Sequence, residues 1–284
     1  MSTEFIDIHP HVISEDTKRY PHAPLFGVQS VWSRDRPVTI EGLIAAMDKA
    51  GVQKAAIVQA STCYGFDNSY VTDAIARYPG RFTAVASVDM LQPDAVKEVR
   101  RWVGKGVTGL RLFTGGSTAE FDTSALDDPR SFPVWDLCSE IGLSMCLQTN
   151  PTGLAQVAGL AKRFPKARIV LDHLSRPDIS DGPPYKKAVS LFALSAFENI
   201  CLKLTPRIFE DSRKGSASPE TFFPRLVEIF GASRLAWGSN FPASEGSMAE
   251  NLEVAKLCLA CLKPEDRHWI FARTAQKLYP TLQD

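Results

Sequence analysis

The sequence of 284 residues has no excess of charge of either sign. Its 32 Lys and Arg residues balance 32 Asp and Glu residues, which gives a formal net charge of zero. Proteins that bind nucleic acids or anionic membrane surfaces usually carry a basic patch or a run of basic residues. Because neither occurs here, we expect no nucleic-acid partner and no membrane partner, and the sequence leaves open whether the protein forms a homo-oligomer.

Long apolar runs and targeting segments are also missing. No run approaches the roughly 18–20 apolar residues of a membrane span, and no charged segment followed by an apolar one precedes the first predicted strand. The six cysteines lie mostly in predicted strands and helices, as the buried thiols of cytoplasmic proteins do. We therefore expect a cytoplasmic protein. Cys258 and Cys261 are three residues apart in a helical pattern, and we expect both to pack in the core.

What the sequence does contain is eight short apolar strands, each followed by a helical pattern. This alternation predicts parallel β-α units, and eight units predict a (β/α)₈ TIM barrel, an α/β fold. With 44% hydrophobic residues and no linker, the chain is expected to form a single domain over residues 1–284. The predicted strands are Phe5–His9, Lys54–Gln59, Phe82–Val88, Val107–Phe113, Leu143–Gln148, Ala167–Asp172, Asn199–Leu204 and Arg234–Trp237.

Polar residues lie where nearly every predicted strand ends. In a TIM barrel the active site lies at the C-terminal ends of the strands, so this pattern is typical of an enzyme. Three long connections follow such strand ends and would surround the same mouth. They are Pro10–Thr39, Thr114–Arg130 and Pro206–Pro219. The polar residues at strand ends are His9, His11, Gln59, Arg111, Gln148, His173, Lys203 and Asn240.

His9 and His11 form an H-x-H pair at the end of the first strand. Residues two apart in a strand point to the same side, so both imidazoles could bind one metal ion. The alternative is two polar histidines at a strand end with no shared role. His173 follows strand six, and Asn240 follows strand eight, which adjoins strand one in a closed barrel. We therefore expect His9, His11 and His173 to converge at one mouth.

Three basic residues could hold a substrate carboxylate. Arg111 suits this role because a guanidinium can grip a carboxylate with two hydrogen bonds, and Lys203 and Arg207 would add positive charge. Lys203 could instead form an ion pair inside the barrel, for example with Asp89, and Arg207 could be a solvated loop residue.

Four further residues are candidates for contacts with the substrate. Ser61 and Tyr64 follow strand two, Gln148 ends strand five, and His22 lies in the first long connection. The hydroxyl groups could donate hydrogen bonds to an oxyanion or a carboxylate. Gln148 could equally satisfy neighbouring backbone groups.

An ordered set of motifs along nearly the whole chain resembles a known family. The motifs are Ile6–His11, Arg19–Pro24, Val58–Ser61, Tyr64–Asn68, Gly109–Leu112, Leu171–His173, Leu202–Leu204 and Trp237–Pro242. They resemble the amidohydrolase superfamily, in particular its amidohydrolase-related branch of pyrone dicarboxylate and sugar lactonases. The resemblance implies a hydrolase that opens a cyclic ester at His9, His11, His173 and Asn240. It also implies that these histidines could bind one divalent metal ion, zinc or manganese, although members of the branch differ in whether they need one.

Asn240 departs from the pattern of the family, which commonly has aspartate there as a metal ligand and general base. An amide cannot take up a proton near neutral pH, so His173 or His22 would have to act as the base, with an ionisation near pH 6.5. We expect a lactonase for a small carboxylated lactone from aromatic or sugar-acid catabolism. The alternatives are a metal-dependent decarboxylase of the same branch and a carboxylate-binding barrel without activity.

Overall fold

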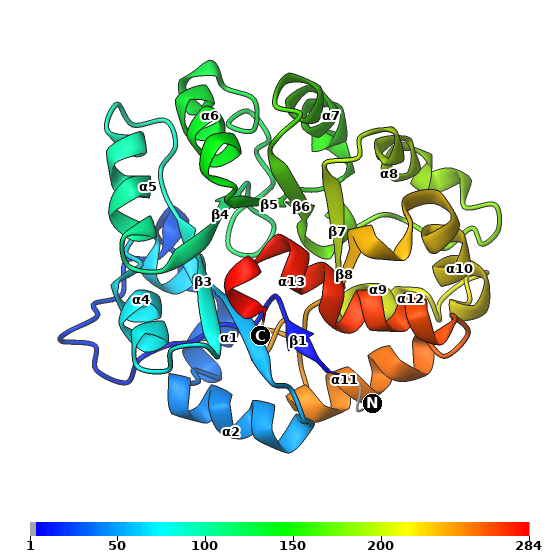
Figure 1. Ribbon diagram of the computed structural model, residues 1–284, viewed down its shortest axis with the longest axis horizontal. Helices are drawn as coiled ribbons and strands as arrows, with labels where there is room; N and C mark the ends of the chain where they lie inside the picture. The colour runs from blue at the N-terminus through cyan, green and yellow to red at the C-terminus, as the bar shows by residue number, and fades with distance from the viewer. Residues whose placement is uncertain (1–3, 284) are drawn as a thin grey trace.

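The computed structural model describes residues 4–283 and has eight parallel strands paired in chain order, from β1 to β8 (Figure 1). All eight predicted strands are present. The strands are β1 (Ile6–Asp7), β2 (Lys54–Val58), β3 (Phe82–Ser87), β4 (Val107–Phe113), β5 (Ser144–Gln148), β6 (Arg168–Leu171), β7 (Ile200–Leu204) and β8 (Leu235–Trp237). The predicted TIM barrel is therefore confirmed.

Strand β1 is two residues long, where five were expected. It ends early because the N–H of His9 donates to the side chain of Asp7, at 2.9 Å, rather than to a neighbouring strand. The chain after β1 nevertheless joins the chain after β8, since the N–H of His11 donates to the carbonyl of Phe241 at 2.8 Å. Gly238 permits this approach: a Cβ there would lie 2.7 Å from the Cβ of His9. These contacts nearly close the barrel.

Helices form a ring outside the strands (Figure 1). Helix α2 shows how the sequence specifies them: Thr39 caps its first turn, and the left-handed Gly51 ends it. The ring contains α2 (Ile40–Ala50), α4 (Ser69–Ala76), α5 (Ala95–Val103), α6 (Phe132–Ile141), α7 (Leu154–Arg163), α8 (Val189–Ala193), α10 (Pro219–Phe230) and α11 (Met248–Cys258). The shorter α1 (Val31–Asp35), α3 (Ser61–Tyr64) and α9 (Pro206–Asp211) follow strands β1, β2 and β7.

The last helical segment, α12 (Pro264–His268) to α13 (Thr274–Leu278), crosses the N-terminal end of the barrel (Figure 1). The buried Tyr279 places its hydroxyl 3.3 Å from the Sγ of Cys146, and the hydroxyl of Ser144 donates to the carbonyl of Leu278 at 2.8 Å. This segment therefore covers the end of the barrel opposite to the C-terminal ends of the strands.

The interior of the barrel changes from apolar to polar along the strands. Near the N-terminal end, Val170, Cys201 and Cys146 belong to a buried apolar cluster. Two residues later, on the same side of each strand, stand Asp172, Lys203 and Gln148, which are also buried. This change from apolar to polar side chains places the charged groups of Asp172 and Lys203 beneath the mouth.

The structure also bears on the expectations about membrane-spanning segments and about the burial of Cys258 and Cys261. No helix within residues 4–283 is long and apolar enough to cross a membrane. Cys258 is buried as expected, but Cys261 is exposed. The expectation for Cys261 was wrong because α11 ends at Cys258, so the helical spacing no longer applies three residues later.

Candidate active site

The centre of the site is the buried carboxylate of Asp172, which follows β6. Its Oδ1 lies 2.7 Å from the Nζ of Lys203 on β7, and its Oδ2 accepts a hydrogen bond of 2.8 Å from the Nε of Arg111 on β4. Lys203 therefore has an ion pair inside the barrel, as one alternative predicted, but the partner is Asp172. Asp89 instead accepts hydrogen bonds from Leu91 and Gln92.

The two cations determine the charge state of Asp172. Burial alone would raise the pKa of this carboxyl group, but Lys203 and Arg111 more than offset burial and hold its pKa below the ordinary value. Asp172 is therefore a permanent anion at neutral pH. Each of its oxygens already faces a cation, so it has little capacity left for a third.

Three imidazoles lie together above this ion cluster. The ring of His9 contacts the rings of His11 and His173 edge-on, with ring centroids 5.0 and 4.9 Å apart. The Nδ1 of His11 donates to the carbonyl of Val58 at 2.8 Å, which leaves its Nε2 as an acceptor. The Nδ1 of His173 lies 2.7 Å from the hydroxyl of Thr205. Among residues 4–283, neither ring nitrogen of the buried His9 has a hydrogen-bond partner.

Burial makes all three imidazoles weak bases. It lowers the pKa of His9 well below 6.5 and the pKa values of His11 and His173 to about 3, and the nearby cation Arg111 contributes in the same direction. Asp172 partly counteracts this effect at His173, where it is the largest cause that raises the pKa. The sequence suggested an imidazole ionisation near pH 6.5. That expectation was wrong for these residues because it took no account of burial.

Asp7 holds the backbone around the site. Its Oδ1 accepts from the N–H groups of His9 and Ser239, at 2.9 and 2.8 Å, and its Oδ2 accepts from the hydroxyl of Ser239. Burial raises the pKa of Asp7 to about 6. Asp7 thus fixes the end of β1 against the chain after β8.

The loop after β6 is strained. His173, Leu174, Ser175 and Arg176 all have φ between 53° and 56°, and Asn240 across the mouth has φ 52°. Side chains other than glycine seldom adopt this left-handed region, and such strain concentrates at functional sites. The turn directs His173 and Arg176 to one cavity.

Arg176 is a residue that the sequence analysis missed. It donates to the carbonyl of Gly116 at 3.2 Å, and its guanidinium lies 5.0 Å from the ring of Phe121. Burial lowers its pKa to about 10, which still leaves it charged at neutral pH. Arg176 was missed because the loop after strand six was not expected to form part of the mouth. The one signal for its role in the sequence was its position three residues after His173.

Most of the predicted site residues surround one polar cavity of about 200 Å³. Gln148 accepts from the Nη2 of Arg111 at 2.5 Å and donates to the carbonyl of Gly115 at 2.9 Å, so it orients the arginine. The hydroxyl of Ser61 lies 2.6 Å from that of Ser87. The predicted residues that line the cavity are His11, Ser61, Arg111, Gln148, His173 and Asn240.

Other predicted residues lie elsewhere. The buried hydroxyl of Tyr64 accepts from the N–H of Ser14 at 2.8 Å, and the exposed His22 packs against Tyr64, with ring centroids 5.7 Å apart. Neither lines the cavity. Arg207 is exposed, with its Nε 3.6 Å from a carboxylate oxygen of Asp211, and it lines an adjoining cavity that shares His173, Arg176 and Asn240 with the polar one. Lys203 is enclosed beneath the cavity.

The three imidazoles are the candidate ligands for a metal ion. An imidazole nitrogen with a free lone pair is a suitable ligand for zinc, and neutral His9 can offer one, with its Nδ1 3.6 Å from Oδ1 of Asp172. No three His, Cys, Asp or Glu side chains of residues 4–283, however, are grouped so that they could hold an ion. Asp172 is paired with Lys203 and Arg111, and Asn240 carries no charge to balance a dication. The arrangement of charges therefore does not fit a divalent metal.

A TIM barrel with converging histidines and fixed charges at its mouth is typical of the hydrolytic class of this fold. The chain belongs to the amidohydrolase family, whose profile matches residues 6–281. It is 26% identical over 282 residues to L-fucono-1,5-lactonase from Burkholderia ambifaria, covering 96% of this chain and 94% of the relative. It is 28% identical over 250 residues to 4-sulfomuconolactone hydrolase from Hydrogenophaga intermedia, covering 84% and 74%.

Solved structures share the fold. An amidohydrolase from Burkholderia multivorans with bound zinc has a TM-score of 0.78 at 19% identity, covering 98% of this chain and 99% of that one. A dihydroxybenzoic acid decarboxylase from Polaromonas sp. JS666 with bound manganese has a TM-score of 0.69 at 16% identity, covering 100% and 98%. These two structures of the same fold thus contain zinc and manganese, respectively.

Proposed function

We propose that the protein is a hydrolase that opens a small carboxylated lactone. The observation that carries this proposal is one cavity lined by two guanidinium groups, of Arg111 and Arg176, and by the imidazoles of His11 and His173. Similarity over most of the chain to two lactone-opening enzymes supports the same chemistry. We further propose that residues 1–284 act as one domain, in the cytoplasm.

The guanidinium groups are positioned to hold the carboxylate of the substrate. Arg111 uses Nε and Nη2 for Asp172 and Gln148, and its Nη1 has no hydrogen bond within residues 4–283. Arg176 has no carboxylate partner in the same part of the chain. The cations of the site are Arg111, Arg176 and Lys203. The anions are Asp7 and Asp172, so one net positive charge remains to attract an anionic substrate.

His173 is the best candidate for the general base. Burial keeps its imidazole neutral at pH 7, although it also makes the imidazole a weak base. The negative charge of Asp172 partly offsets this, because it favours the imidazolium that forms when His173 takes a proton from the attacking water. The ester carbonyl then becomes a tetrahedral oxyanion, which fixed cations in a buried cavity stabilise. When the ring C–O bond breaks, the imidazolium returns its proton to the leaving alkoxide, which gives the hydroxy acid.

Asn240 would orient the water rather than deprotonate it. It lines the cavity, and its Nδ2 donates to the hydroxyl of Ser244 at 2.9 Å. This contact turns the amide nitrogen towards Ser244 and leaves the amide oxygen as an acceptor. Because the charges around His9, His11 and His173 do not fit a divalent ion, we propose a reaction that does not need one.

The experiment is a screen of small lactones with and without a carboxylate. We expect ring opening of carboxylated lactones, loss of activity in His173→Asn, and unchanged activity in His22→Asn, which alters a histidine outside the cavity. Release of carbon dioxide from an aromatic acid would instead indicate the decarboxylase alternative. Binding of the carboxylated lactone without turnover by the parent would favour the carboxylate-binding protein, which Asn240 supports.

A further inference from the structure

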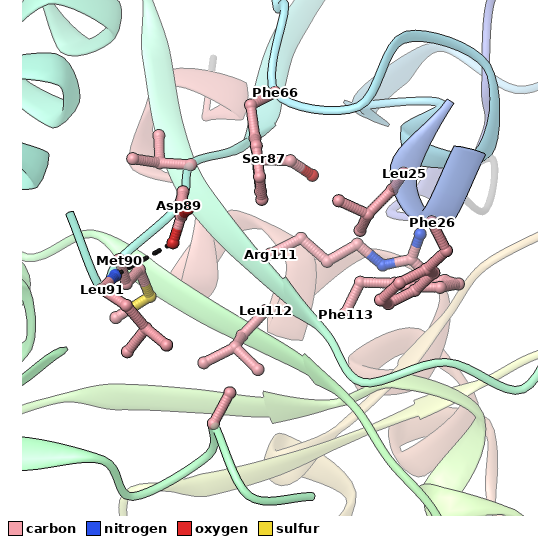
Figure 2. Close-up of a pocket in the computed structure, with 12 residues that line it drawn as sticks. Leu25, Phe26, Phe66, Ser87, Asp89, Met90, Leu91, Arg111, Leu112 and Phe113 are labelled. Carbon is pink, nitrogen blue, oxygen red and sulfur yellow. Dashed lines mark hydrogen bonds between the residues drawn. The ribbon is translucent and has the colours of Figure 1, made fainter. Parts of the chain in front are cut away.

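A second cavity adjoins the polar one and has the opposite character (Figure 2). It is lined mainly by Leu25, Phe26, Phe66, Met90, Leu112 and Phe113 and has a volume of about 160 Å³. In Figure 2, Phe26 and Phe113 lie at one end of it, and Met90 and Leu91 lie at the other. Such a space next to a hydrolytic site requires a ligand group that is apolar.

The two cavities share Arg111 and Phe113. The guanidinium of Arg111 lies 5.0 Å from the centre of the Phe113 ring, and that ring lies 6.1 Å from the ring of Phe26. A ligand whose carboxylate is held by Arg111 can therefore extend an apolar group along Phe113 into the second cavity. Because of this continuity, we treat the second cavity as part of the substrate site.

The chain places Phe26 at this position by a defined loop contact. The N–H of Ala23 donates to the carbonyl of Cys63 at 2.9 Å, which ties the first long connection to α3. Gly65 permits the contact, since a Cβ there would lie 2.5 Å from the carbonyl oxygen of Ala23. Phe26 and Phe66 remain 48% and 42% exposed. Large apolar side chains at the edge of a site are a common sign of a surface that a ligand covers.

The polar groups of the second cavity already have partners. Asp89 accepts from the N–H of Leu91 at 3.1 Å and from the side chain of Gln92 at 2.8 Å, and the hydroxyl of Ser87 is paired with Ser61. Only the remaining lone pairs of Asp89 could accept from a substituent rich in hydroxyl groups, as in a sugar acid, so most of those hydroxyl groups would lose water there without gaining a partner. The lining thus favours an apolar substituent.

We propose that the natural lactone carries, besides its carboxylate, an apolar substituent of about the size of a benzene ring. The size follows from the volume, because an apolar cavity of about 150 Å³ is known to bind benzene. This inference rests on the proposed lactonase function and narrows it, from any small carboxylated lactone to one with an aryl or similarly sized alkyl group.

The test compares two lactones, a five-membered lactone carboxylate and the same compound with a phenyl substituent on its ring. We expect kcat/KM to be at least about tenfold higher for the phenyl compound, because filling an apolar pocket typically raises kcat/KM by at least this factor. Ala125→Trp, whose indole would occupy the cavity that Ala125 lines, should remove this preference. Phe66→Ser, at an exposed position, should reduce the preference without affecting folding. Leu257→Ser, at an exposed position outside the cavity, is the control.

A binding measurement separates this inference from the lactonase proposal. Calorimetry with the two ring-opened hydroxy acids should show tighter binding of the phenyl acid, again lost in Ala125→Trp. If the parent opens neither lactone but shows this difference in binding, the lactonase proposal fails and the apolar subsite stands. If the plain lactone is opened equally well or better, or if Ala125→Trp leaves the preference unchanged, the apolar subsite is wrong.

Discussion

The two ends of the barrel are built from the same strands but contain opposite kinds of side chain. At the N-terminal end, Val170 and Cys201 pack against the segment that contains α13. Two residues later, Asp172 and Lys203 form a buried ion pair beneath the mouth. Apolar burial gains free energy without requiring specific partners, whereas each buried charge is tolerated only with its partner in place. The N-terminal end therefore provides stability, and the C-terminal end gives up some of it for a fixed arrangement of charges.

The largest effect should come from breaking the ion cluster. Asp172→Asn would leave the ammonium of Lys203 buried without a counter-ion, and we expect the free energy of unfolding to fall by about 3–5 kcal/mol. Lactone opening should be lost as well. Denaturant unfolding measures the change, with Glu228→Gln as the control. Glu228 forms an exposed pair with Arg225, and its loss should cost no more than about 1 kcal/mol. Equal losses in the two variants would show that the buried cluster has no special role.

A cavity at the N-terminal end should affect stability alone. Leu278 is buried in the apolar cluster, and Leu278→Ala should lower the free energy of unfolding by about 2–5 kcal/mol. At a temperature where the variant is folded, we expect kcat/KM to stay within about twofold of the parent value. A large loss of activity in the folded variant would show that the two ends are coupled.

Acid should destabilise the C-terminal end. Below pH 6.5 the unfolded chain binds protons at His9, His11 and His173, whereas the folded protein does not until about pH 3 at His11 and His173. Stability therefore falls as the pH falls through this window. Asp7 acts in the opposite direction between about pH 6 and its unfolded value of 3.8, since the folded protein takes up that proton first, but three histidines outweigh it.

We expect a net loss on the order of 4 kcal/mol between pH 7 and pH 5. Urea unfolding at several pH values measures this loss. Asp7→Asn should make the pH dependence of stability steeper between pH 6 and 5, because it removes the opposing contribution of Asp7. Stability that does not change from pH 7 to 5 would contradict the burial of neutral imidazoles.

The smallest effect concerns binding of the substrate carboxylate. Arg111 was expected from the sequence to hold the substrate carboxylate, but its bond to Asp172 makes Arg111→Ala a test of folding as well as of binding. Arg176 is the cleaner probe, since its only hydrogen bond within residues 4–283 goes to the carbonyl of Gly116. We expect Arg176→Ala to raise KM about tenfold, with little change in kcat or in the melting temperature. A lowered melting temperature with unchanged KM would make Arg176 structural.

The strands could be predicted because the pattern of apolar residues and turns is local. His9, His11 and His173 could be placed at one mouth for the same reason, since each follows a strand. The partner of Lys203 could not be predicted, because pairing across β4, β6 and β7 depends on how deep each side chain lies. The low pKa values of the imidazoles depend on burial, which a strand-end position does not reveal.

Loops account for the other differences. Tyr64 and His22 were expected to contact the substrate. The hydroxyl of Tyr64 instead accepts a hydrogen bond from Ser14, and His22 packs against Tyr64 outside the cavity. Arg176 enters the cavity through four consecutive left-handed residues, a conformation for which the sequence contains no glycine signal. Its role was therefore missed.

The most direct test of the account is the rate at which His173→Asn opens a carboxylated lactone at pH 7. If His173 is the base and Asn240 is not, kcat/KM should fall at least about a hundredfold, while His22→Asn keeps the parent rate. Full activity in His173→Asn would contradict the account. So would an Asn240→Asp protein that opens lactones on which the parent is inactive, because the parent would then be a binding protein that lacks its base.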